Sequence, residues 1–391
     1  MTVPYQQYTP SLLEPAYPKR TRQLEDLAVD LVVRASRLTQ GLHPTVVTTL
    51  GELVRSMNCY YSNLIEGHRT LPTDIERALS QDLSQDPKQR DFQLEAKAHI
   101  EVQRLIDLDS DWQERSPVSL DMMQHIHQAF YERLPERFWA IESKMIVPGE
   151  LRSINVKIGA HVPPYPEVVP KFLERFSQLY DPSRLSKLEQ VIFSGAAHHR
   201  FLWIHPFPDG NGRVVRLMSH AYLQRSGVGN SLWSISRGLA RQVNTYRQLL
   251  ALADQQRRND YDGRGNLTLK GLADFSEFFL ETCIDQVDYM SQLFEPQRLL
   301  KRMEAYVMIE THERQLLPGS FAILKAAFLE GKLNRGDAAA LTGYKERQAR
   351  SVLKRLLEAG LLSSTSPKGP VKLSFPVVAA QQWFPRLWSE G

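Results

Sequence analysis

Apolar positions recur at helical spacing along most of the chain. Side chains three and four positions apart line one helix face, and such faces are present in most long segments. The predicted helices cover residues 24–38, 44–66, 92–108 and 117–134, and one or two more cover 271–310 with an interruption near Pro296. Pro44 suits a first helical turn, Ser119 is a candidate N-cap, and Gly67 suits a helix end. The pattern predicts a mainly α fold.

One segment departs from this pattern. Residues 151–159 largely alternate apolar and polar side chains, which is the period of a β-strand. Pro163, Pro164 and Pro166 follow and end any strand pairing. A small β-hairpin is therefore predicted, and in a helical protein such a hairpin usually just covers the core.

The last segment, from Gly319 onward, predicts three short helices and then a hairpin. This order resembles a winged helix-turn-helix, with Gly343 at the turn and its third helix at residues 345–357. That helix is basic, as entry into a DNA groove requires. Its cationic residues are Lys345, Arg347, Arg350, Lys354 and Arg355. Winged helices also serve as protein-contact or dimer modules, so DNA contact and a homodimer both stay open.

Composition adds limits rather than a function. The chain has 391 residues, enough for two or three domains, and its 42% hydrophobic and 24% charged content is ordinary for a globular protein. A net charge of +4 does not by itself imply nucleic acid. The two cysteines make no metal spacing and fit a reduced compartment. The N-terminal segment has no basic region followed by an apolar one, so a cytoplasmic location without membrane insertion is expected.

The stretch 205–216, HPFPDGNGRVVR, carries the most chemistry, and it predicts a short loop that feeds a helix. Gly210 and Gly212 permit a backbone whose amides turn inward around an anion. Arg213 and Arg216 lie on one face of the first helical turn, where cations are unfavourable unless an anion sits between them. Together these groups predict a polyphosphate site.

Two neighbours of that site predict a reaction. His205, just upstream, is a candidate general base, and Asp209 is an oxygen ligand suited to Mg²⁺ bound together with substrate phosphates. Each residue alone fits a glycine-rich turn before a solvated basic helix. Their occurrence within one short stretch favours the phosphate site.

The end of the predicted helix 44–66 has the opposite charge arrangement. Ser62 and Glu66 are four positions apart and share a face, and Glu66 lies in a last turn, where a carboxylate opposes the helix dipole. The two misplaced charges, Glu66 here and the arginines of the other helix, would each be relieved by meeting the other. Glutamates in last turns are common, so this inference is only suggestive.

The stretch 205–216 resembles the signature of Fic proteins, H-x-F-x-(D/E)-G-N-G-R-x-x-R, at every specified position. The resemblance implies transfer of AMP from ATP to a protein hydroxyl. It implies that His205 deprotonates the hydroxyl, that Asp209 holds Mg²⁺ and that Arg216 holds the γ-phosphate. Phe207 would anchor the loop in the core. Charge on the phosphates would be stabilised by Arg213 and by the amides of Gly210, Asn211 and Gly212.

A second motif extends the resemblance. Ser62, Glu66 and Gly67 match (S/T)-x-x-x-E-(G/N), the inhibitory motif of Fic proteins, which implies that Glu66 pairs with Arg216 and blocks placement of the γ-phosphate. The segment at 151–159 is similar to the flap on which Fic proteins align their targets by strand pairing. Its target-facing candidates are Ile154, Asn155, Val156 and Lys157, and candidates beside the nucleotide base are Asn244 and Tyr246.

We therefore expect a Fic-type helical core with a small β-hairpin flap, plus a C-terminal winged helix. The expected domains are an inhibitory region at 1–112, the catalytic core at 113–290, a helical linker at 291–318 and the winged helix at 319–391. The expected reaction is self-inhibited transfer of AMP to a Ser, Thr or Tyr hydroxyl of a protein, with self-modification, using ATP and Mg²⁺.

Three alternatives remain at this stage. Glu66 is also placed to align a water that removes AMP from a modified target. A metal-dependent phosphohydrolase built on His198, His199, His205 and Asp209 leaves the Gly-Asn-Gly-Arg pattern unexplained. A nucleotide-sensing regulator would use the winged helix on DNA, with a steep salt dependence.

Overall fold

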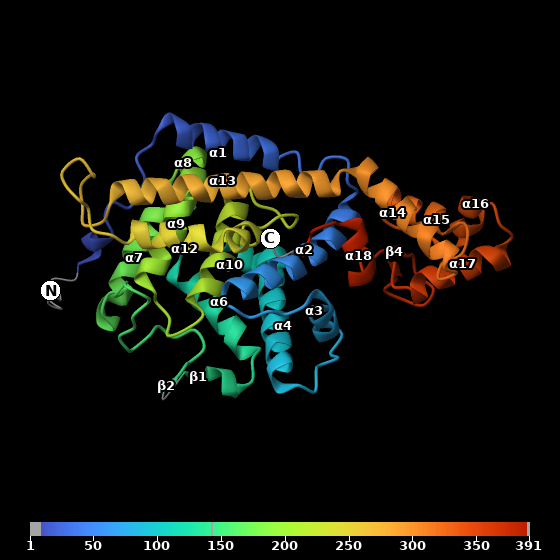
Figure 1. Ribbon diagram of the computed structural model, residues 1–391, viewed down its shortest axis with the longest axis horizontal. Helices are drawn as coiled ribbons and strands as arrows, with labels where there is room; N and C mark the ends of the chain where they lie inside the picture. Colours follow the sequence, from blue (N-terminus) through green and yellow to red (C-terminus); the bar gives the residue numbers. More distant parts are fainter. Residues whose placement is uncertain (1–8, 142–143, 389–391) are drawn as a thin grey trace.

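The structure, a computed structural model, describes residues 9–141 and 144–388. One long helix, α13 (Leu269–Phe294), runs along the main body, with α1 (Arg22–Ala35) packed on one side and α9 (Ser194–Ile204) and α12 (Val243–Ala253) on another (Figure 1). Pro296 starts the next helix, α14 (Pro296–His312), which leads to a smaller group of elements at one end of the molecule. The predicted break near Pro296 is confirmed.

Helices dominate the remaining elements, so the predicted mainly α fold is confirmed. Up to residue 114 the chain also forms α2 (Pro44–Ile65), α3 (Pro72–Leu79), α4 (Pro87–Leu108) and α5 (Ser110–Glu114). After residue 114 it adds α6 (Leu120–Glu132), α7 (Val169–Tyr180), α8 (Lys187–Ile192), α10 (Asn211–Arg225) and α11 (Ser236–Arg241). The Ser119 side chain caps α6 by accepting from the amide of Met122 at 3.1 Å, as its sequence position predicted.

The strand predicted at 151–159 is wrong. The hairpin lies upstream, where β1 (Ala140–Ile141) pairs antiparallel with β2 (Lys144–Met145). Residues 151–159 are irregular apart from a bridge between Ile158 and His161. The reason lies with Arg152, whose amide donates to the carbonyl of Pro206 at 2.9 Å and whose side chain donates to the carbonyl of His205 at 2.7 Å, so this segment pairs with none of the described strands. The alternation of side chains alone did not reveal this.

The C-terminal group contains α15 (Ser320–Glu330), α16 (Ala338–Thr342) and α17 (Glu346–Glu358), followed by β3 (Leu362–Ser363) paired with β4 (Lys372–Leu373). This is the order predicted for a winged helix, and that assignment stays a prediction. The chain then returns to the main body through α18 (Val377–Trp383), which contacts α14 and α3. Beyond α18, the carbonyl of Leu387 accepts from the Tyr61 hydroxyl of α2 at 3.1 Å.

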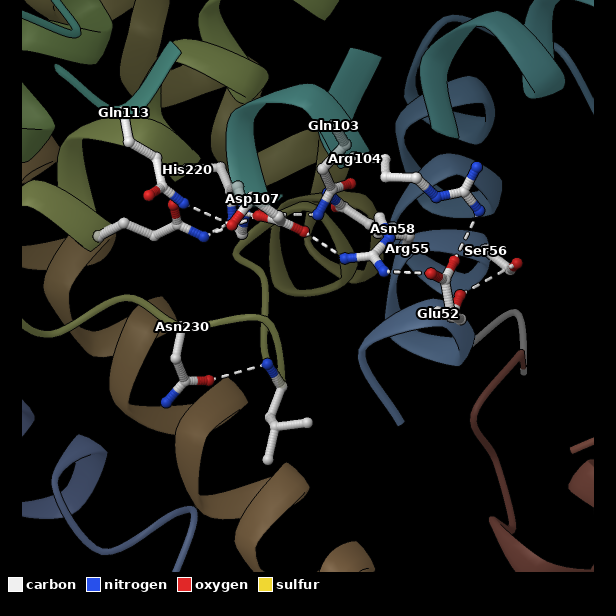
Figure 2. Close-up of polar contacts among 12 residues, drawn as sticks. Glu52, Arg55, Ser56, Asn58, Gln103, Arg104, Asp107, Gln113, His220 and Asn230 are labelled. Atoms are coloured by element: carbon white, nitrogen blue, oxygen red, sulfur yellow. Dashed lines mark hydrogen bonds and ion pairs between the residues drawn. The ribbon is translucent and has the colours of Figure 1, made fainter. Parts of the chain in front are cut away.

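A buried polar network joins α2, α4 and α10 (Figure 2). Asp107 of α4 lies between Arg55 of α2, at 2.6 Å, and His220 of α10, at 2.7 Å. The side chains of Arg55 and Asp107 are each 1% exposed. Asn58 of α2 donates to Gln103 of α4 at 2.6 Å beside them. These contacts fix the helix that carries the inhibitory motif against the helix that carries the signature.

Among residues 9–141 and 144–388, no helix is long and apolar enough to span a membrane.

Candidate active site

His205 occupies a strained turn between two helices. It ends α9 in the left-handed region, at φ 50° and ψ 63°, which non-glycine residues seldom adopt. The guanidinium of Arg152, a side chain from the irregular segment, donates to the His205 carbonyl at 2.7 Å and holds the turn. Burial and the nearby Arg152 lower the pKa of His205 to about 4. The imidazole is therefore neutral at pH 7, the form that accepts a proton.

The loop after His205 is closed by one side chain. Asn211 accepts from the amide of Phe207 at 2.9 Å and donates to its carbonyl at 2.8 Å. The Phe207 ring is fully buried and stacks on His127 of α6 at 4.2 Å between ring centroids. Phe207 is thus buried in the core, as expected, with the His127 ring as its stacking partner. The side chain of Asn211 thus shapes the loop, while its backbone amide lies at the start of α10.

Asp209 is exposed, and one of its carboxylate oxygens accepts a hydrogen bond from another side chain. The hydroxyl of Tyr131, from α6, donates to Oδ2 of Asp209 at 2.6 Å. Within the described part of the chain, no three His, Cys, Asp or Glu residues group to hold a metal ion. A single carboxylate with a fixed orientation fits Mg²⁺ that takes its other ligands from water and substrate phosphates. The residues present are therefore compatible with the expected ion.

Glu66 meets Arg216 across the start of α10. Its Oε1 accepts from Nη2 of Arg216 at 2.5 Å, while Ser62 Oγ accepts from Nε of Arg216 at 2.9 Å. Burial raises the pKa of the Glu66 carboxyl, but Arg216 and Arg213 outweigh it and bring the pKa below its usual range. A side chain at position 212 would collide with Oε1 of Glu66, so Gly212 allows this approach. The predicted pairing is present in the structure.

The turn after α2 explains the rest of the inhibitory motif. Gly67 has φ 85°, in the left-handed region, and the amide of His68 donates to the carbonyl of Asn63 at 2.9 Å. Arg247 of α12 donates to the carbonyl of Ile65 at 2.8 Å. This contact satisfies one of the carbonyls left free at the helix end. Glu66 is therefore presented from a well-defined helix end.

The remaining candidates are spread more widely. Ile154, Asn155, Val156 and Lys157 lie in the irregular segment, so a strand-like flap at these positions is absent, and their contact with a target stays a prediction. Asn244 is exposed on α12. Tyr246 is buried, and its hydroxyl forms a hydrogen bond with His198 at 2.8 Å. A role of either residue beside the base stays a prediction.

Comparison with known proteins matches residues 117–223 to the model of the Fic/DOC family, a range that includes α6, α9 and most of α10. The chain contains a Fic domain. Curated relatives named protein adenylyltransferase Fic are 38% identical over 79 residues in Drosophila erecta and 39% identical over 79 residues in Drosophila virilis. The matched part is 20% of this chain and 16% of the length of either relative.

Solved structures extend the likeness beyond the Fic domain at the level of fold. A Fic family protein from Desulfovibrio desulfuricans aligns over 93% of this chain and 99% of its own, at 18% identity and a TM-score of 0.53. A fragment of Fic-1 from C. elegans aligns over 70% of this chain and 73% of its own, at 17% identity and a TM-score of 0.54. The fold around residues 117–223 is thus similar to that of solved Fic proteins.

Proposed function

We propose that this chain transfers AMP from ATP to a Ser, Thr or Tyr hydroxyl of a protein, itself included, and that Glu66 inhibits the transfer. The observation that carries the proposal is the Glu66 carboxylate, held by Arg216 at the N-terminus of α10. Helix N-termini flanked by arginines bind phosphate groups. A carboxylate at this helix N-terminus occupies the position of a phosphate and prevents a phosphate from binding. The named relatives of the Fic domain support the reaction class.

In the proposed reaction the target oxygen attacks the α-phosphorus of ATP. The new bond is oxygen to phosphorus, the bond to the bridging oxygen breaks, and pyrophosphate leaves. The neutral imidazole of His205 takes the hydroxyl proton. The loop amides from Gly210 to Gly212, with Arg213, stabilise the charge that develops on the phosphates, which is usually the largest catalytic contribution. Mg²⁺ held at Asp209 would neutralise part of that charge.

The test of this reaction compares two labels. Purified Glu66→Gly protein is incubated with Mg²⁺ and ATP labelled at either the α- or the γ-phosphate, and label on protein is followed. AMP transfer predicts stable label from α-labelled ATP only. Label from γ-labelled ATP would indicate phosphoryl transfer instead. The matched control is Glu66→Gly/His205→Ala, which should retain its melting temperature and lose the label because the proton acceptor is gone.

A separate observation supports a second proposed role, contact with duplex DNA through α17. Its buried positions include Ala349, Val352 and Leu356, while Lys345, Arg347, Arg350 and Lys354 are exposed on the remaining surface. Arg350 and Lys354 pair with glutamates of the same helix. Binding of a random-sequence duplex is therefore expected to weaken steeply with salt, and Arg347→Ala to reduce the salt slope by about one. Salt-independent binding would contradict this role.

A further inference from the structure

The first signature arginine is held by a residue from outside the Fic domain. Arg213 of α10 is 6% exposed, and its Nη2 donates at 3.1 Å to Oε1 of Glu95, which is also 6% exposed. Glu95 lies in the middle of α4, before the range matched to the family model at residue 117. The contact is a charge-assisted hydrogen bond between two buried groups, the strong kind.

A third group completes this cluster. His68, just after the inhibitory motif, approaches Oε2 of Glu95 at 2.6 Å with its Nδ1. The same Nδ1 lies 3.2 Å from Nη2 of Arg213. The His68 ring stacks on Phe92 of α4 at 5.0 Å between centroids. Both carboxylate oxygens of Glu95 are therefore occupied, and the side chain has little freedom to turn away.

Two contacts orient the guanidinium of Arg213, and one of its hydrogen-bond donors has no partner among the described residues. Its central carbon lies 5.1 Å from the centre of the Phe130 ring, in cation–π contact. One terminal nitrogen is bound to Glu95. Its Nε is buried and has no hydrogen-bond partner among the described residues. A buried donor without a partner is costly, and an anion binding at the start of α10 would satisfy it.

We propose that Glu95 is a positioning residue that orients Arg213 toward the phosphates of ATP. The proposal rests on the AMP transfer proposed above and adds that the phosphate site is completed from α4. Holding one corner of the guanidinium fixes the direction of its remaining donors before the nucleotide arrives. Such preorganisation matters because a misplacement of about 1 Å can cost about 100-fold in rate.

Burial separates this carboxylate from the inhibitory one. Glu66 sits at a helix end with 33% of its side chain exposed, so it can turn into solvent when a nucleotide enters. The Glu95 side chain is 8% exposed and extends from the interior of a 22-residue helix, with His68 on its second oxygen. Each signature arginine is thus paired with its own carboxylate. Glu66 can be displaced from Arg216, whereas Glu95 remains bound to Arg213. Glu95 therefore supports catalysis, and Glu66 opposes it.

The experiment uses the full chain with Glu66→Gly as the parent, so that inhibition does not mask the effect. Glu95→Gln keeps a hydrogen-bond acceptor and loses the charge, and Glu95→Ala loses both. The matched control is Glu101→Gln on the same helix, where the side chain is 33% exposed and pairs with Arg133 and Lys97. The measured quantities are kcat and KM for ATP, the dissociation constant of ATP by calorimetry, and the melting temperature.

We expect kcat/KM to fall about 10-fold with Glu95→Gln and about 100-fold with Glu95→Ala, and ATP to bind more weakly, while Glu101→Gln matches the parent. Repeating Glu95→Gln on an Arg213→Ala parent should then have no further effect on ATP affinity, because Glu95 acts through Arg213. A purely structural residue would lower the melting temperature equally on both parents.

Two results would overturn the proposal. Faster labelling with Glu95→Gln would make Glu95 a second inhibitor, and unchanged kcat/KM and ATP affinity with a lower melting temperature would make it purely structural. If the Glu66→Gly parent binds ATP but transfers nothing, the proposed function fails. The ATP dissociation constants then still test Glu95, so the two failures are distinguishable.

Discussion

Asp107→Ala tests whether the inhibitory helix is fixed to the signature helix by the buried network of Figure 2. The substitution removes the α4 partner of the Arg55 guanidinium, which is 1% exposed and keeps only Glu52 of its own helix, at 2.7 Å. It also removes the acceptor of His220 on α10 at 2.7 Å. Breaking a buried ion pair by removing one partner costs about 3–5 kcal/mol, and because Arg55 keeps Glu52 we expect a cost near about 3 kcal/mol. Asp107→Asn keeps an acceptor and should cost less.

The matched control is Asp288→Ala. Asp288 also pairs with an arginine, Arg34, at 2.5 Å, but the two side chains are 38% and 42% exposed. Exposed pairs of this kind contribute about 1 kcal/mol or less. An entropy of unfolding of about 2 cal/mol/K per residue means that 1 kcal/mol shifts the melting temperature of a chain of this length by about 1 °C. Thermal unfolding followed by circular dichroism should therefore show a drop of about 4 °C for Asp107→Ala, and about 1 °C or less for the control. Equal drops would refute the reasoning that the network is what fixes α2 against α10.

Two further predictions concern protonation and the metal ligand. Five histidines that are buried or half-buried have pKa values below the usual 6.5. As pH falls, the unfolded chain therefore binds protons before the folded chain does, and stability declines from pH 6.5 toward about pH 4, by about 1.4 kcal/mol per pH unit for each histidine. The melting temperature should be level above pH 7 and fall below pH 6.5, and a level curve down to pH 5 would contradict this. The residues are His99, His127, His198, His199 and His205. Tyr131→Phe frees Oδ2 of Asp209 and should raise the Mg²⁺ concentration for half-maximal labelling by about 3-fold or more, with a maximal rate similar to that of the parent at saturating Mg²⁺. An unchanged Mg²⁺ titration would show that the hydroxyl does not orient the ligand.

Much of the fold followed from the spacing of apolar residues. Helices such as α1 were predictable because one face is buried, here by Leu24, Ala28, Leu31 and Ala35. The opposed helix dipoles suggested that Glu66 meets the signature arginines, and the resemblance to Fic proteins implied Arg216 as its partner. The strand at 151–159 was not a sound inference. Alternation identifies a strand only when a neighbouring strand is available, and here Arg152 bonds to carbonyls of the signature loop.

The supporting residues of the site could not be found in this way. Tyr131, Glu95 and His127 come from helices distant in sequence and belong to neither of the two motifs. These residues can be recognised only from their positions in the folded chain, where α4 and α6 place them beside the signature loop and α10. A tyrosine or a glutamate on an apolar helix face has many ordinary explanations. Sequence thus identified the groups that would contact ATP, and structure identified those that hold them.

The central claim is that Glu66 keeps an AMP transferase inactive through Arg216. The measurement is the initial rate of self-labelling with α-labelled ATP and Mg²⁺ for wild type, Glu66→Gly and Glu66→Gly/Arg216→Ala at equal protein concentration. The account predicts a rate at least about 10-fold above wild type for Glu66→Gly, and loss of that gain when Arg216 is also removed. Equal rates for wild type and Glu66→Gly, with ATP bound by both, would contradict it.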